Sequence, residues 1–126
     1  MRNMKRYRIL HALLVASLIL TFGCEETVRE PLSKDSTPPG PVTAPTVVNI
    51  PGGAVITYLL PKETDLLYVK AEYELSNGVK VETKSSIYTN SVKVEGFGDT
   101  KEREVKLYAV DRSENLSTPI TVKVQP

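Results

Sequence analysis

The amino-acid sequence beyond residue 37 predicts an all-β fold, a two-sheet sandwich of about seven short strands. Apolar and polar residues alternate there in short runs, which is the period of a strand with one buried face. Val, Ile, Thr and Tyr dominate these runs, and Asn77-Gly78 is the strongest short hairpin signal. Helical periodicity is absent from the sequence after the N-terminal apolar segment. Seven strands in fewer than 90 residues therefore predict one core closed between two sheets.

The expected strands follow one another at short intervals. Ala54–Leu59 is bounded by the turn Pro51-Gly52-Gly53 and by Pro61, and Leu67–Leu75 has apolar residues at every second position. After the hairpin signal, a strand returns from Val79 to Glu82. From their phase, Tyr58 and Tyr73 belong to the core. Three later strands are marked by apolar pairs or triplets: Val92 and Val94; Val105, Leu107 and Ala109; Ile120, Val122 and Val124.

The N-terminus has the organisation of a secretory signal, which we assign to residues 1–23. Its first eight residues carry four bases and no acid, and Ile9–Phe22 is almost wholly apolar. That run of 14 residues is short of the roughly 20 that a membrane-spanning helix needs. The segment is therefore predicted to be a cleaved signal and not a permanent membrane helix.

The only cysteine of the chain, Cys24, lies where a bacterial lipoprotein carries its lipid. Leu20–Cys24 resembles the lipobox, with Gly23 at the small position before the cut. The alternative is an ordinary secretory signal followed by a free thiol. Lipidation predicts a membrane partner through the lipid anchor. Because Glu25 and Glu26 resemble the surface-export signal of gut Gram-negative lipoproteins, we expect an outer-membrane, lipid-anchored, surface-exposed protein, with the periplasmic face as the alternative.

Residues 24–37 are predicted to form a proline-rich tether. Six of the nine prolines fall between Pro31 and Pro51, among Ser, Thr and Gly, and such sequence buries too little apolar surface to fold. Asp35-Ser36-Thr37 resembles an acceptor motif for bacterial protein O-glycosylation, which makes Ser36 a candidate site. An ordinary polar linker is the alternative. The sandwich domain is then expected to cover residues 38–126.

The composition of the mature part excludes several classes of function. Without residues 1–23 the chain has 12 basic and 15 acidic side chains, so it lacks the positive surface of a nucleic-acid-binding protein. It also has no histidine, because His11 lies in the signal, and no cysteine beyond Cys24. We therefore expect no cofactor, no metal site, no catalytic residues and no enzymatic activity. The acidic Asp111–Asn115 segment is interpreted as a turn, and the carboxylates of Asp65, Glu72, Glu74 and Glu82 as a solvated face.

Residues from about 35 to 125 resemble a fibronectin type III domain. Asp35–Val42 is similar to the proline-rich first strand of bacterial members, and Tyr58 stands where the family keeps its core tryptophan. Val92–Phe97 is similar to the run that ends in a glycine and a buried apolar residue, and Val105–Ser117 resembles the closing hairpin. The resemblance implies an immunoglobulin-like, fibronectin type III-like sandwich. The family's corner tyrosine would fall at Arg103.

The combination of signal, tether and sandwich also resembles a narrower group of proteins. These are surface lipoproteins from polysaccharide-utilisation loci of gut bacteria, and the resemblance is to their uncharacterised N-terminal domain. In those proteins further modules follow, often a discoidin-like one. The resemblance implies that this chain, which stops at Pro126, is a truncated copy or a fragment, and that glycan binding belongs to parts beyond it.

Two functions remain open on this basis. The first is a non-catalytic spacer or interaction domain of a glycan-capture system, with a glycan or other outer-membrane glycan-uptake proteins as partners. The alternative is a direct carbohydrate-binding module that uses an exposed tyrosine face. Tyr68 and Tyr108 have the phase of outward residues on two strands that should be neighbours. They form either a stacking platform for sugar rings or a cross-strand pair that stabilises the sheet.

Overall fold

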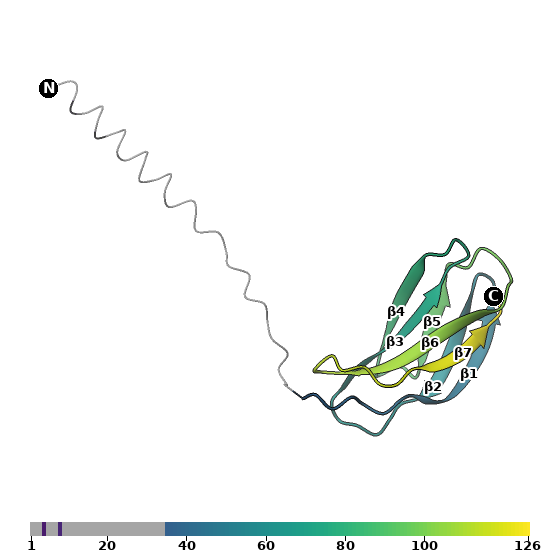
Figure 1. Cartoon of the computed structure of the whole chain (residues 1–126), viewed down its shortest axis with the longest axis horizontal. Coiled ribbons are helices and arrows are strands. Elements are labelled where there is room, and N and C mark those ends of the chain that lie inside the picture. Colours follow the sequence, from purple (N-terminus) through teal and green to yellow (C-terminus); the bar gives the residue numbers. More distant parts are fainter. Residues whose placement is uncertain (1–3, 5–7, 9–34) are drawn as a thin grey trace. The chain divides into compact units, whose positions relative to one another are not determined.

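A computed structural model describes residues 35–126, together with Met4 and Arg8, and shows seven strands and no helix in residues 35–126 (Figure 1). The strands form two antiparallel sheets, so the prediction of an all-β, two-sheet sandwich is confirmed. Apart from Met4 and Arg8, the expected signal, Cys24 and most of the expected tether lie outside the described residues. The strands are β1 (Thr43–Ile50), β2 (Gly53–Leu59), β3 (Leu66–Glu74), β4 (Lys80–Ser86), β5 (Ser91–Glu95), β6 (Arg103–Asp111) and β7 (Ile120–Val124).

The two sheets divide the strands unequally. One sheet has three strands in the order β1-β2-β5, and the other has four in the order β4-β3-β6-β7. The β3 strand is therefore paired on both sides, with β4 and with β6. In the described part of the chain, no helix has the length and hydropathy needed to cross a membrane.

The core lies between the sheets and is built from the inward residue of each alternating pair. On β6, the side chains of Val105, Leu107 and Ala109 have no solvent exposure. Tyr58 and Tyr73 are also buried, as their phase predicts. The buried cluster comprises Val42, Ala54, Ile56, Tyr58, Leu66, Val69, Ala71, Tyr73, Val92, Val94, Phe97, Val105, Leu107, Ala109, Val122 and Val124.

Two glycines are required by the turns that set the register. Gly78 has a φ of +82° in the β3–β4 hairpin, where its N–H donates to the carbonyl of Leu75 at 2.9 Å. At Gly53, an added Cβ would lie 2.3 Å from the carbonyl oxygen of Val94. Any side chain there would push β2 away from β5, so the Pro51-Gly52-Gly53 turn is tied to the packing of the smaller sheet.

The first strand begins later than the resemblance implied. Asp35–Val42 was expected to be the first strand, but β1 starts at Thr43. Prolines at positions 38, 39 and 41 have no N–H to donate to a ladder, which explains why pairing starts after them. The segment still packs on the domain, because Pro39 and Val42 are buried. The β4 strand likewise begins at Lys80, and Val79 is an exposed turn residue.

The sandwich has two ends of different construction. The Asp35 end comprises residues 35–42, the β2–β3 loop, the β4–β5 turn and the β6–β7 loop. Here the side-chain amide of Asn115 donates to the carbonyl of Asp35 at 2.8 Å, and the N–H of Gly40 donates to Glu63 Oε1 at 2.8 Å. The Asp35 N–H also donates to Ser113 Oγ at 3.2 Å. These bonds fix where the chain enters the domain.

The Pro126 end comprises the β1–β2 turn, the β3–β4 turn, the β5–β6 loop and the C-terminal residues (Figure 1). The backbone N–H of Gln125 donates there to the side-chain oxygen of Asn49 at 2.9 Å. The N–H of Gly96 donates to the carbonyl of Gly52 at 3.0 Å, which joins the β5–β6 loop to the β1–β2 turn. Residues 35 and 126 therefore lie at opposite ends of the strands.

Candidate functional site on the four-stranded sheet

Tyr68 and Tyr108 lie on the outer face of the four-stranded sheet, on the adjacent strands β3 and β6. In the antiparallel register Tyr68 is opposite Val110, and Tyr108 is opposite Lys70, so the two tyrosines are diagonal neighbours. Both side chains are half-buried. The structure thus brings the two residues to one face, but it does not present them as a fully exposed pair of rings.

A lysine of the same domain lies over each of the two rings. Lys84 Nζ is 4.8 Å from the centroid of the Tyr68 ring, and Lys70 Nζ is 5.2 Å from the centroid of the Tyr108 ring. A cation at this distance is attracted to the negative face of an aromatic ring. A sugar ring that stacked on these faces would have to displace the lysines. The alternation along the sequence located the two tyrosines on one face. It did not reveal that Lys84, on the neighbouring strand β4, lies over Tyr68.

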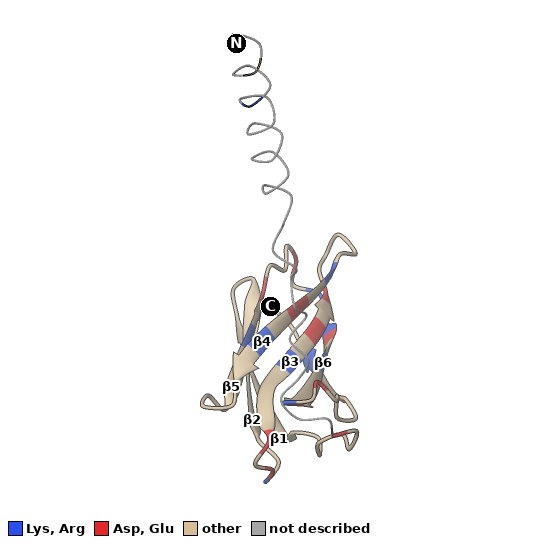
Figure 2. Cartoon of the chain, turned by 90° about the vertical axis from the view of Figure 1, so that its left-hand side faces the viewer, with Lys and Arg blue, Asp and Glu red and all other residues tan. Residues whose placement is uncertain are grey.

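The lysines belong to a network of ion pairs across β3 and β4. Lys70 Nζ lies 2.7 Å from Glu72 and 3.7 Å from Glu82, and Lys84 Nζ lies 3.8 Å from Glu82. Figure 2 shows the resulting bands of basic and acidic residues on the neighbouring strands of this sheet.

Three pKa values respond to this network. The hydrogen bond between Lys70 and Glu72 raises the pKa of the ammonium group and lowers that of the carboxyl. Partial burial, followed by the nearby charge of Glu72, raises the pKa of Tyr108. Each shift favours the form that the group has at neutral pH: the charged ammonium of Lys70, the carboxylate of Glu72 and the neutral phenol of Tyr108.

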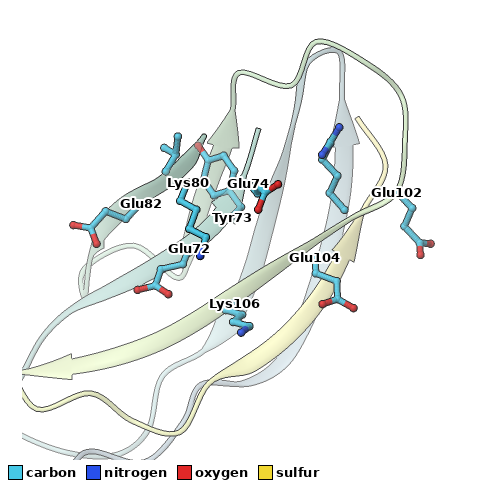
Figure 3. Close-up of a pocket in the computed structure, with 10 residues that line it drawn as sticks. Glu72, Tyr73, Glu74, Lys80, Glu82, Glu102, Glu104 and Lys106 are labelled. Carbon is cyan, nitrogen blue, oxygen red and sulfur yellow. The ribbon is translucent and has the colours of Figure 1, made fainter. Parts of the chain in front are cut away.

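A groove of about 560 Å³ adjoins this face toward the Pro126 end (Figure 3). In Figure 3, Glu72 and Glu82 project from β3 and β4, Glu104 comes from the start of β6, and Glu102 from the end of the β5–β6 loop. The groove offers carboxylate acceptors and ammonium and guanidinium donors, which is the chemistry of polar binding. Its lining residues are Glu72, Tyr73, Glu74, Lys80, Val81, Glu82, Glu102, Arg103, Glu104 and Lys106.

Sequence reasoning missed this groove. It identified Glu72, Glu74 and Glu82 only as a solvated face, and it assigned no role to the charged run at residues 102–104. The groove follows from the register of the sheet. In this register Glu72 lies opposite Lys106 of β6 on one side and opposite Glu82 of β4 on the other. That register depends on which strands become neighbours.

The sequence also drew attention to Cys24, to Ser36 and to the acidic segment around Asp111. Cys24 lies outside the described residues, and Ser36 is exposed next to the hydrogen-bonded Asp35. Asp111 is buried, and its Oδ1 accepts from the backbone N–H groups of Ser113 and Asn115 at 2.8 and 2.9 Å. This carboxylate therefore organises a turn. Within residues 35–126, no group of three or more His, Cys, Asp or Glu side chains is arranged to hold a metal ion.

Comparisons with known proteins agree with the sandwich. Residues 39–126 match the family described as "Domain of unknown function (DUF4959)". None of the curated proteins matches the chain.

Two solved structures share the fold at low sequence identity. The crystal structure of the Clostridium perfringens spore cortex lytic enzyme SleM is similar with a TM-score of 0.58 and 16% identity, over 75% of this chain and 31% of that one. This chain thus spans about a third of the length of that enzyme. A structure titled "Myokine structure" is similar with a TM-score of 0.54 and 14% identity, over 70% of this chain and 98% of that one.

Proposed function

This chain belongs to the DUF4959 family, and we propose that it acts as a non-catalytic spacer and interaction domain of a surface lipoprotein in a glycan-capture system. The observation that carries the proposal is the position of the two ends. At one end of the strands, the N–H of Asp35 donates to Ser113 and its carbonyl accepts from Asn115; at the other end, the N–H of Gln125 donates to Asn49. A domain built in this way keeps apart the segments or modules that are joined to its two ends.

The distance of separation follows from strand length. The nine residues of β6 run between the two ends, and at about 3.4 Å per residue they span about 30 Å. Seven strands in two hydrogen-bonded sheets connect the two ends, so a bend at any one residue does not change the distance between them. The spacer is therefore a rigid one, in contrast to a proline-rich linker alone.

The proposed anchor is a lipid on Cys24, in the outer membrane and on the cell surface. It is supported by the basic and apolar signal in residues 1–23, by the lipobox-like Leu20–Cys24 and by the acidic pair Glu25-Glu26. Two or more acyl chains on one residue suffice for stable anchoring. The acidic excess of the mature part argues against a nucleic acid as partner.

Expression of the full chain in a gut Gram-negative host with a clickable palmitate analogue tests the anchor. We expect label on the wild type, none on Cys24→Ser, and removal of the labelled protein from intact cells by external protease. An unlabelled wild type would contradict the lipoprotein assignment. Label with protease resistance would place the protein on the periplasmic face.

The second candidate function is direct carbohydrate binding, favoured by the groove beside Tyr108 and by its mixed carboxylate and ammonium lining. Detergent-solubilised mature protein should be passed over soluble and insoluble polysaccharides. The spacer function predicts no retention on any of them. Retention that Tyr68→Ala with Tyr108→Ala abolishes would establish the carbohydrate-binding function in its place.

A further inference from the structure

Exposed large apolar side chains gather at the Asp35 end. Tyr88 is 92% exposed, and Leu59, Leu67 and Leu116 are 57%, 43% and 44% exposed. Leu59 ends β2, Leu67 is near the start of β3, and Tyr88 and Leu116 lie in the β4–β5 turn and the β6–β7 loop. All four therefore belong to the end at which the chain enters the domain.

Within residues 35–126, the other large apolar side chains with this exposure are Val48, on the edge strand β1, and Val79, at the Pro126 end. The two ends thus differ in character. The Pro126 end carries the charged groove, while the Asp35 end carries the exposed leucines and tyrosine. Exposed apolar groups that share one end of a domain are candidates for a contact surface.

The turn that presents Tyr88 is rigid. The carbonyl of Ser86 accepts from the N–H and from the hydroxyl of Thr89, each at 3.0 Å, and Ser86 Oγ accepts from the N–H of Tyr88 at 3.3 Å. Ile87, next to Tyr88, packs against the core. The carbonyl of Asn90 accepts from the N–H of Tyr58 at 3.0 Å. The backbone at Tyr88 is therefore fixed before any partner arrives, which reduces the entropy lost on binding.

The Asp35 end carries few charges, with a small excess of acid. Residues 35–42 and the loops 60–65, 87–90 and 112–119 contain two bases, Lys62 and Arg112, and four acids, Asp35, Glu63, Asp65 and Glu114. Such a surface is not attracted to anionic lipid, so its affinity for a membrane must come from its apolar side chains. Tyr and Leu are side chains that suit the boundary between headgroups and acyl chains, because the tyrosine hydroxyl stays hydrated while the ring is buried.

We propose that the Asp35 end docks on the lipid surface of the membrane, with Tyr88 and Leu116 inserted at the interface. The inference rests on the proposed lipid anchor at Cys24. Ten residues lie between Cys24 and Asp35, so this end stays within about 40 Å of the anchor, at about 3.3–3.6 Å for each of the eleven steps along the chain. A tethered surface at that range acts at high effective concentration, and a small apolar contact suffices. Docking sets the strands upright, with the groove facing away from the membrane.

The test uses the full lipoprotein reconstituted in vesicles of phosphatidylethanolamine and phosphatidylglycerol at 3:1. Because Cys24 is the chain's only cysteine and carries the lipid, an introduced thiol is the single labelling site. Thr64→Cys and Thr100→Cys are a matched pair, since both threonines are exposed and they lie at opposite ends. Each is labelled with an environment-sensitive fluorophore, and nitroxide-labelled lipid is added as quencher. We expect several-fold stronger quenching at position 64 than at position 100.

Tyr88→Ser combined with Leu116→Ser, in the Thr64→Cys background, should reduce the quenching to the level at position 100. Val48→Ser combined with Val79→Ser is the matched control and should leave it unchanged. Equal quenching at the two positions, insensitivity to Tyr88 and Leu116, or loss of quenching in 0.5 M salt would each overturn the proposal. So would a difference seen only in native outer-membrane vesicles, which would identify a protein partner.

Flotation separates this proposal from the anchor. Protein that floats with the vesicles but shows equal quenching retains its lipid anchor and lacks docking. Protein that fails to float lacks the anchor, which overturns both the lipoprotein assignment and the docking that rests on it.

Discussion

Arg103 and Asp99 form an ion pair, with Nη2 and Oδ2 2.8 Å apart, that joins the start of β6 to the β5–β6 loop. The guanidinium carbon of Arg103 also lies 6.0 Å from the ring centroid of Phe97. The fibronectin type III resemblance places a corner tyrosine at position 103, whose hydroxyl would bond back to the preceding loop. Here Arg103 links the start of β6 to the β5–β6 loop through its guanidinium group. Burial alone would raise the pKa of Asp99, but hydrogen bonds from Lys101 and Arg103 outweigh it and lower that pKa.

This link predicts energetic coupling between the two residues. Asp99→Ala should lower the urea midpoint of unfolding, and Arg103→Ala should lower it further because it also uncovers Phe97. The double variant should lose less than the sum of the two single losses, since each single change already breaks the pair. Glu102→Ala is the matched control: its pair with Lys123 is solvent-exposed and should contribute almost nothing. Strictly additive losses would show that the pair does not hold the corner.

Leu107→Ala should destabilise the domain by about 2–5 kcal/mol, because the substitution leaves a cavity between the sheets. The side chain of Leu107 has no solvent exposure. Lys106→Ala, one residue earlier on the outer face, should change the free energy of unfolding by less than about 0.5 kcal/mol. Equilibrium urea unfolding measures both. Similar losses for the two variants would contradict the strand phase.

Glu72→Gln should make the stability less sensitive to acid. The folded pKa of Glu72 is lowered by Lys70, so its contribution is fully present above the unfolded carboxyl pKa and is lost as the pH falls through the folded value. The side chain is 42% exposed, so solvent screening keeps this contribution below about 1 kcal/mol. The urea midpoint should therefore fall less between pH 6 and pH 3 in the variant than in the wild type. An identical fall in both proteins would exclude a stabilising role for the Lys70–Glu72 pair.

Asn115→Ala should loosen the place where the chain enters the domain. The side-chain amide of Asn115 donates to the carbonyl of Asp35 at 2.8 Å and to the carboxylate of Asp111 at 2.9 Å, and alanine removes both bonds. Amide hydrogen exchange in residues 35–42 should accelerate, while exchange in β3 stays slow. Asn77→Ala, in the turn at the opposite end, serves as the control. Unchanged exchange in residues 35–42 would contradict a fixed connection at this end.

Much of the fold was predictable because side-chain direction in a strand alternates with a period of two. That period alone placed Tyr58, Tyr73 and Leu107 in the core, as the structure confirms. The Asn77-Gly78 hairpin was predictable for a local reason, the positive φ that glycine adopts readily. The delayed start of β1 was not predicted, although the prolines that cause it are visible in the sequence.

The sequence by itself determined the strands, their phase and a composition with no histidine after His11, and it predicts the signal that points to Cys24. Only the tertiary structure decided which strands are neighbours, and hence that Lys84 of β4 covers Tyr68 of β3. It also brought Glu102 and Glu104 to the groove beside Glu72, and gathered Tyr88 and Leu116 at one end. The physical reason is that phase is a local property of each strand, whereas these contacts depend on pairing between residues far apart in the chain, which no local pattern encodes.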